Sequence, residues 1–318
     1  MDAEDRELLV QSVRGSLADA HDPEAALQAL GWPEMLVGAP REATAIVFEA
    51  LGTTAQRPTV INDVLASVLG SELPIGTATI VLPRYDTATP PAVIDDRTAT
   101  IDGLVVPRTS RFDVVCVPCQ SSSGRCIVEV PSASLHTRPI AGIDPDLGLV
   151  AVQGSAGATT THALEHGAWD RAVVAAQRAL GHQILGSGRR MLALARDHAI
   201  ERVQFGHPVA SFQAVRHRLA EAFVALEAAD AALVAAWDEP GELTGALAKS
   251  LAGRAGRVAA AASQQVLAGI GFTAEHELHR HVRRVAALDG LFGSSASLPR
   301  SIGAQLVAAR TVPRLIEL

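Results

Sequence analysis

Apolar residues in the first part of the chain recur three and four positions apart, which is the spacing of one face of a helix. The segments with this spacing are ELLVQSVRGSL, PEAALQALG and ATAIVFEALG, and glycines end two of them. The pattern therefore predicts an N-terminal helical domain over residues 1–76.

Between residues 77 and 153 the pattern changes to short runs rich in Val, Ile and Thr, separated by Pro, Gly, Asp and Ser. Such runs are typical of strands, and several in succession indicate a small sandwich or barrel. The runs are TATIVL, TATIDGLVV, FDVVCVP and RCIVEV. We expect a middle β domain here, followed by a flexible joint at GSAGATT, residues 154–160.

Residues 161–318 return to helical spacing and are rich in alanine. A first long helix is expected up to the interruption at Phe205-Gly206-His207-Pro208, a second after it, and a third over about 243–267. The residues expected on one face of the second helix are Val215, Leu219, Phe223, Leu226, Leu233 and Trp237. The chain is thus predicted to be a mostly helical α+β protein that ends in an antiparallel four-helix bundle.

Composition narrows the class of function. The 318 residues are 48% hydrophobic, which is enough for a large core. The net charge of −7 and the aromatic content of 3% argue against a basic surface or base stacking for nucleic acid. The start MDAEDRELLV is acidic where a signal peptide would be basic, and no run of 18 apolar residues occurs. We expect no nucleic-acid partner, no membrane and a cytoplasmic location.

The chain contains three cysteines, Cys116, Cys119 and Cys126. An odd number without an export signal fits free thiols in a reducing compartment. Cys116 and Cys119 are three apart, so on a strand they face opposite sides. A structural zinc ion needs four ligands, and no second pair follows. Structural thiols are therefore expected rather than a zinc site.

Histidines offer no better metal site. His162 and His166 are four apart, which suits a helical metal pair, but no third ligand is evident, and a solvated helix start is favoured. The run HELHRH, residues 276–281, lacks the spacing of H-E-x-x-H. Its histidines His279 and His281 are expected at a surface beside neighbouring arginines. We therefore assign no metal.

Two motifs about sixty residues apart stand out in the helical half. The first is R-V-Q-F-G-H-P-V-A-S-F-Q, from Arg202 to Gln213, and the second is Q-V-L-A-G-I-G-F-T-A-E, from Gln265 to Glu275. A loop between packed helices needs a Gly and a Pro, but it does not need that Arg. These motifs, and the order of helices, strands and helices, resemble the acyl-CoA dehydrogenase family.

The resemblance implies that the chain contacts FAD. In this family the Arg, the residue two after it and the Phe of the first motif contact the ADP half of the flavin, as do a Gln and a Gly of the second, across a subunit interface. The cofactor residues that the resemblance implies are Arg202, Gln204, Phe205, Gln213, Gln265 and Gly269. A guanidinium gives paired donors to a diphosphate, and a Gly allows close backbone approach. The alternative is that Arg202 only caps the C-terminal end of its helix.

The family's catalytic base has no counterpart in this sequence. The family removes an α-proton from an acyl-CoA with a Glu, while a hydride leaves the β-carbon for flavin N5. By resemblance that Glu would stand at Phe292, or at Gly293 in a register shifted by one, or at about Ala176. None of these accepts a proton, and the nearby acids Asp289 and Asp170 more often solvate a helix end. No catalytic residue is assigned.

The chain also lacks the T-E-P-x-x-G-S-D loop that holds the flavin ring in the family. The resemblance therefore points to a base-less subunit that pairs with a full-length acyl-CoA dehydrogenase as an α2β2 heterotetramer, as in actinobacterial steroid degradation. The partner would hold the flavin ring, the base and the acyl-CoA substrate, a bulky CoA thioester such as a steroid-derived one. Two alternatives remain: a homomeric enzyme with a displaced base such as Asp289 or Glu275, and a scaffold that binds no flavin.

Overall fold

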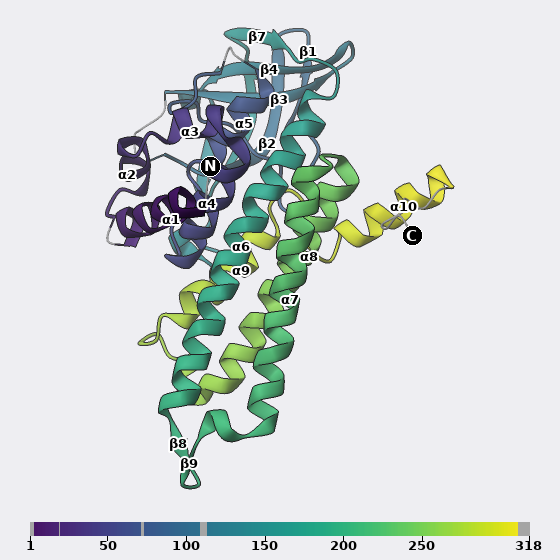
Figure 1. The fold of residues 1–318 in the computed structure, drawn as a ribbon. Coiled ribbons are helices and arrows are strands. Elements are labelled where there is room, and N and C mark those ends of the chain that lie inside the picture. The colour runs from purple at the N-terminus through teal and green to yellow at the C-terminus, as the bar shows by residue number, and fades with distance from the viewer. Residues whose placement is uncertain (1–2, 19, 71–72, 109–112, 311–318) are drawn as a thin grey trace.

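The computed structural model describes residues 3–18, 20–70, 73–108 and 113–310. Helices precede a sheet, and longer helices follow it (Figure 1). The helices before the sheet are α1 (Ala3–Ala18), α2 (Pro23–Ala29), α3 (Trp32–Gly38), α4 (Pro40–Thr53) and α5 (Ile61–Leu69). The prediction of a mostly helical α+β protein is confirmed.

Local sequence explains where these helices begin. The side chain of Asp22 accepts hydrogen bonds of 3.1 Å from the backbone N–H groups of Glu24 and Ala25, and Pro23 occupies the first helical position of α2. Proline suits that position because its missing N–H would have no helical partner. Helices α3 and α5 were not expected from the spacing of apolar residues.

Seven strands of the described chain form one sheet in the order β5-β6-β2-β1-β3-β4-β7. They are β1 (Ala92–Asp95), β2 (Thr98–Val105), β3 (Val114–Ser121), β4 (Gly124–Pro131), β5 (His136–Pro139), β6 (Val150–Gly157) and β7 (Thr160–Ala163). Strand β1 runs parallel to β3, and the other pairs are antiparallel. Short 3-10 helices, η1 (Ser132–Ser134) and η2 (Pro145–Leu147), lie in its loops.

Two expectations about the sheet are wrong. The run TATIVL is not a strand, because it crosses from β3 to β2 and makes one bridge to each, Ile80 to Cys116 and Leu82 to Leu104. The expected flexible joint is largely strand: β6 pairs with β2 over its whole length, and β7 pairs with β4. The sheet thus runs to Ala163, beyond residue 153. The division into three domains stays a prediction.

The three cysteines are free and buried. Cys116 packs in the large core that the sheet shares with the helices, whereas Cys119 and Cys126 pack in a second core formed by the sheet and its loops. Cys116 and Cys119 therefore face opposite sides of β3, as expected. Burial raises the pKa of the Cys116 thiol to about 11 and that of Cys119 to about 12.

The helices after the sheet form the elongated part of the molecule. They are α6 (Ala168–Glu201), α7 (Gln213–Asp238), α8 (Glu242–Leu267), α9 (Leu278–Asp289) and α10 (Leu298–Ala309). Helix α6 runs from the sheet to the far end of the bundle, where a small hairpin lies, and α10 projects from the side (Figure 1). No helix in the described ranges is long and apolar enough to cross a membrane.

The buried stripe of α7 differs from the expected one. Its buried residues are Ala222, Leu226, Ala229, Leu233 and Ala236. Alanines at these positions let α7 lie close to its neighbours, which rotates Phe223 out of the interface and leaves that side chain 54% exposed. The prediction that Phe223 faces the core is therefore wrong.

Helices α4 and α6 cross with their backbones in contact. A Cβ atom at Gly186 would clash with the Glu49 carbonyl, and one at Gly52 would clash with the Gln183 carbonyl. Polar bonds reinforce the crossing: Glu49 accepts from Arg189 at 2.9 Å and lies 3.3 Å from His182. Glycines are needed here because no side chain fits between the helices.

We expect Gly186→Ala to destabilise the fold by about 1–3 kcal/mol or more, because the added methyl group overpacks the crossing and no flexible side chain can yield. Chemical denaturation measures the effect. Gly303→Ala in α10 is the matched control, since nothing lies within 4 Å of its Cβ position, and it should be neutral or stabilising by up to about 1 kcal/mol. Equal stability of the Gly186 variant and the wild type would contradict the close crossing.

Candidate functional site

The first motif forms a β-hairpin at the far end of the bundle. Strands β8 (Val203–Gln204) and β9 (His207–Pro208) pair around Phe205 and Gly206, whose φ angles are +53° and +81°. Two left-handed central residues define a type I′ turn, which favours Gly at the second position. Phe205 is 89% exposed at the tip. The interruption that was expected between the two helices is therefore a β-hairpin.

Arg202 stands where α6 ends and the hairpin begins. Its backbone N–H donates to the His198 carbonyl at 2.8 Å, and its carbonyl accepts from Val209 at 2.8 Å. Within the described residues, no helix carbonyl accepts a hydrogen bond from the Arg202 guanidinium. The exposed side chain is therefore free to bind a ligand rather than engaged as a helix cap.

The second motif lies where α8 ends. The chain leaves the helix through Ala268, which has a φ of +51°, into η4 (Ala268–Phe272). Gln265 is exposed on the last turn of α8, and Gly269 has nothing within 4 Å of its Cβ position. The backbone at Gly269 is therefore open to close approach by a ligand.

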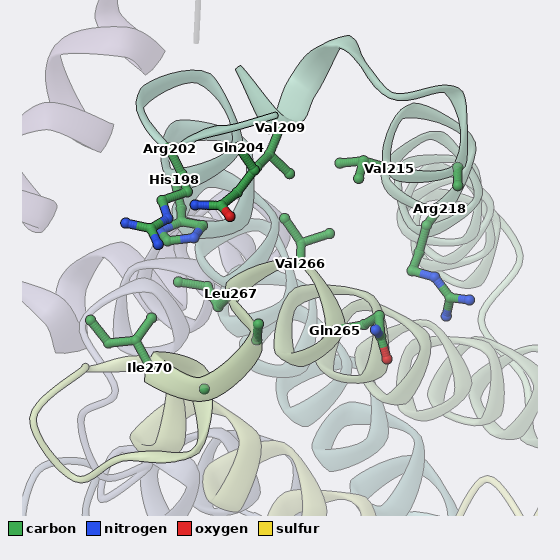
Figure 2. A pocket seen from close by; sticks show the side chains of 13 residues that line it. His198, Arg202, Gln204, Val209, Val215, Arg218, Gln265, Val266, Leu267 and Ile270 are labelled. Atoms are coloured by element: carbon green, nitrogen blue, oxygen red, sulfur yellow. The ribbon is translucent and has the colours of Figure 1, made fainter. Parts of the chain in front are cut away.

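The two motifs meet in one open cavity of about 920 Å³ (Figure 2). Four of the predicted residues line it: Arg202, Gln204, Gln265 and Gly269. Phe205 lies outside the lining at the hairpin tip, and Gln213 is the first residue of α7, next to the lining residue Ala214. The roles of all six residues stay predictions.

Two basic residues of this cavity were missed by the sequence analysis. His198 lines it one turn before Arg202 on α6, and Arg218 lines it one turn after Ala214 on α7. Counting one helical turn outward from the first motif would have found both. Burial, and then the charges of Arg202 and His276, lower the pKa of His198.

The cavity suits a phosphorylated nucleotide. None of its described lining residues is acidic, while Arg202 and Arg218 carry positive charge and the two glutamines supply amide donors. Apolar walls are provided by Val209, Val215, Val266 and Leu267. Its volume lies in the range of small-molecule sites, roughly 300–1,000 Å³. The residues present therefore fit the ADP half of FAD.

The positions where the family would carry its base are packed core. Phe292 and Ala176 are both fully buried. The Phe292 ring lies 6.5 Å from that of Trp169, and its carbonyl accepts a hydrogen bond of 3.0 Å from Gln177. No proton-accepting side chain occupies either position.

Asp289 is buried and bonded rather than solvating a helix end, so that expectation is wrong. Its carboxylate accepts from Ser295 Oγ at 2.6 Å and from Arg257 at 3.0 Å. Lys249, the sole lysine, is fully buried and donates to the Asp289 and Gly293 carbonyls at 2.9 and 3.2 Å. Burial lowers the pKa of Lys249 to about 8. These bonds fix the loop that would present a base.

The other candidate acids lie elsewhere. Asp170 forms an ion pair of 2.6 Å with Arg125, and Glu275 is exposed beyond the end of α8. His281 is buried, not on the surface as expected, and burial lowers its pKa to about 4. His162 lies on strand β7, so it forms no helical pair with His166.

No group of three or more His, Cys, Asp or Glu side chains in the described chain is arranged to hold a metal ion.

The segment that precedes β1 is hydrogen-bonded to the loop between α9 and α10. Asp86 donates its N–H to the Gly290 carbonyl at 2.8 Å and accepts from the Ser294 N–H at 3.0 Å. Trp169 donates its indole N–H to the Ala88 carbonyl at 2.9 Å. Sheet and bundle are thus joined directly beside Phe292.

Comparison with known proteins agrees with the fold and the motifs. Residues 158–307 match the model of the family described as acyl-CoA dehydrogenase, C-terminal domain. This part of the chain is therefore similar to an acyl-CoA dehydrogenase C-terminal domain, and the whole chain has the acyl-CoA dehydrogenase fold. Proteins of this family bind FAD, and solved structures include a complex with FADH2.

One curated relative comes from a mycobacterium. Acyl-CoA dehydrogenase IpdE2 of Mycobacterium tuberculosis is 31% identical over 169 residues, which are 53% of this chain and 51% of that protein. The alignment therefore spans about half the length of this curated relative.

Solved structures match over nearly the whole chain. The ChsE4-ChsE5 complex of Mycobacterium tuberculosis has a TM-score of 0.80 at 21% identity and covers 98% of this chain and 99% of that one. The Tcur3481-Tcur3483 steroid ACAD has a TM-score of 0.79 at 20% identity, with coverages of 96% and 99%.

Proposed function

We propose that this chain is a base-less subunit of a heteromeric, FAD-dependent acyl-CoA dehydrogenase. The enzyme would introduce an α,β double bond into a bulky CoA thioester such as a steroid-derived one. The observation that carries the proposal is the cavity between the two motifs, whose basic and amide side chains at one end of α6 suit a nucleotide, together with the packed core at Ala176 and Phe292.

This chain's own residues would hold the ADP half of FAD. The Arg202 guanidinium offers paired donors to the diphosphate, and Gln204 and Gln265 offer amide groups. Gly269 lets the backbone approach the ligand because it has no side chain. When bound, FAD supplies the acceptor for the hydride that leaves the β-carbon of the thioester.

The flavin ring would belong to another subunit. Ala176 lies on α6, and Arg202 directly follows that helix 26 positions later, which corresponds to roughly 39 Å at 1.5 Å per residue. That is longer than an extended FAD molecule. Arg202, which lines the cavity, follows the end of α6 that lies away from the sheet (Figure 1). One FAD in this cavity therefore does not reach the region of Trp169 and Phe292 in the same chain.

A full-length acyl-CoA dehydrogenase fits the role of partner, in an α2β2 heterotetramer. It would supply the Glu base, the seat for the flavin ring and the thioester site. The ChsE4-ChsE5 structure, with which this chain shares its fold, is a complex of two differently named proteins. The name of the Tcur3481-Tcur3483 protein motivates the steroid-derived substrate.

Two alternative functions are less well supported. A homomeric enzyme with a displaced base would need a free carboxylate, but Asp289 is buried and paired, and Glu275 is the last residue of the second motif, away from the positions where the family carries its base. A scaffold without flavin would not need the basic cavity, in which the side chains of Arg202, Arg218 and Gln265 have no hydrogen-bond partner among the described residues.

Arg202→Ala should weaken FAD retention by the complex about ten- to a hundredfold, because a charge-assisted bond to phosphate contributes about 1.5–3 kcal/mol. Gln265→Ala should weaken it less. The measurement is the flavin content of the complex after gel filtration. Arg254→Ala, an exposed arginine of α8 outside this cavity, is the control and should retain wild-type flavin. Wild-type flavin content in the Arg202→Ala complex would contradict the assignment of Arg202 to the FAD site.

Replacing the remaining acids should leave the chemical step intact. Loss of a general base costs about 10²–10⁴ in rate, so Asp289→Asn, Asp170→Asn and Glu275→Gln should each keep flavin reduction within about tenfold of wild type. Asp289→Asn leaves Arg257 without its ion-pair partner and should lower stability. The rate is therefore measured by single-turnover flavin reduction per bound FAD. Abolished reduction in Asp289→Asn with FAD and assembly retained would favour the homomeric enzyme.

A further inference from the structure

A further cavity lies on the opposite side of α6 from Ala176. Its volume is about 600 Å³, and it is formed by the first turns of α6 together with the end of α5 and the connection from α7 to α8. The lining residues Arg171, Val174 and Arg178 share one face of α6 at about 100° per residue, and Ala176 falls on the opposite face. This cavity is therefore separate from the packed core beside Ala176.

Arg178 is a partly buried cation of this cavity without a counter-ion. Its Nη1 atom donates to the Ala236 carbonyl at 3.2 Å, and its guanidinium lies 3.7 Å from the centre of the Trp237 ring. Nε is buried without a hydrogen-bond partner, and no carboxylate of the described residues forms an ion pair with the side chain. Burial lowers the pKa of Arg178 to about 10. Because a desolvated charge without a partner costs free energy, an anion that reaches it would be bound favourably.

Arg189, further along the same helix, is paired where Arg178 is not. It forms ion pairs with Glu49 at 2.9 Å and with Asp230 at 2.7 Å, and it lies 3.7 Å from Glu227. Although burial alone would lower the pKa of Arg189, the charges of these carboxylates raise it. The fold thus neutralises one half-buried arginine of α6 with its own carboxylates and leaves the other unpaired.

The orientation of the Arg178 guanidinium is fixed by a chain of hydrogen bonds behind it. The Trp237 indole N–H donates to Nε2 of His182 at 3.2 Å. Because Nε2 accepts, Nδ1 of His182 carries the proton and donates to Glu49 at 3.3 Å. A guanidinium that stacks on a fixed ring and bonds to a carbonyl is already ordered, so binding of a ligand does not have to order it.

The rest of the lining sets the charge and the shape of a ligand. Apolar side chains form part of the wall: Val68, Val174 and Pro240. Asp170 and Arg171 are each paired with a residue outside the lining, at 2.6 and 3.3 Å, and Glu242 is exposed and forms no ion pair with Arg178. One free cation beside apolar side chains suits a single carboxylate, whereas the acidic neighbours disfavour a multiply charged phosphate.

We propose that this cavity binds a small amphipathic carboxylate. The carboxylate group pairs with the Arg178 guanidinium, and the apolar part of the ligand lies along Val68, Val174 and Pro240. The volume is within the range of small-molecule sites, roughly 300–1,000 Å³. This site contains no residue of the two sequence motifs, and the inference does not rest on the proposed function.

The test is titration of the full-length chain with octanoate at neutral pH by ligand-observed NMR, with octanol as the uncharged control ligand. We expect the wild type to bind octanoate more tightly than octanol. Arg178→Gln should weaken octanoate binding about ten- to a hundredfold, because a charge-assisted hydrogen bond is lost, and should leave octanol binding unchanged. Arg178→Lys should weaken octanoate binding less, because the charge is kept. Arg254→Gln, outside this cavity, is the charge-matched control and should change neither.

Two results would overturn the inference. One is equal octanoate affinity of Arg178→Gln and the wild type. The other, which requires no variant, is octanol binding as tightly as octanoate to the wild type. Arg202→Ala should leave octanoate binding unchanged, and a loss in that variant would place the ligand in the cavity between the two motifs instead. None of these results changes the FAD retention that tests the proposed function, so the two failures are distinguishable.

Discussion

The close packing of α6 against α8 is the constraint on which the candidate site depends. Small residues make it possible: a Cβ atom at Gly256 would lie 2.8 Å from Ile184, and Ser263 donates its hydroxyl to the Met191 carbonyl at 2.9 Å. The two helices run side by side and end at the same level, so Arg202 and Gln265 line one cavity although they are far apart in sequence.

The other end of the bundle is packed core rather than an open cavity. Where α6 meets the sheet, Phe292 and Trp169 pack together, and the buried Lys249 and Asp289 fasten the loop that leads to α10. An acyl-CoA dehydrogenase needs an open pocket and a carboxylate in that region, and this chain has core instead. One end of the bundle thus carries the cavity that we propose to bind a nucleotide, while the other end is packed core.

The sequence predicted those features that depend on local patterns and contiguous motifs. Arg202 and Gln265 were found because their motifs are contiguous, whereas Arg218 lines the cavity only through the packing of α7. The second half of β6 was missed because residues 154–157 have no local strand signal and owe their extended form to pairing with β2. Phe223 points outward because alanines occupy the buried face of α7. Counting strongly hydrophobic residues does not find this face, because alanine packs closely without being strongly hydrophobic.

The central claim is that this chain contributes to a flavin site that it cannot complete alone. The most direct measurement is the flavin content and acyl-CoA-dependent flavin reduction of the chain purified alone and purified after co-expression with a full-length acyl-CoA dehydrogenase. We predict a flavin-free chain alone and a complex that retains FAD, whose flavin is reduced by substrate. A chain that alone retains one FAD and reduces it with acyl-CoA would contradict the account.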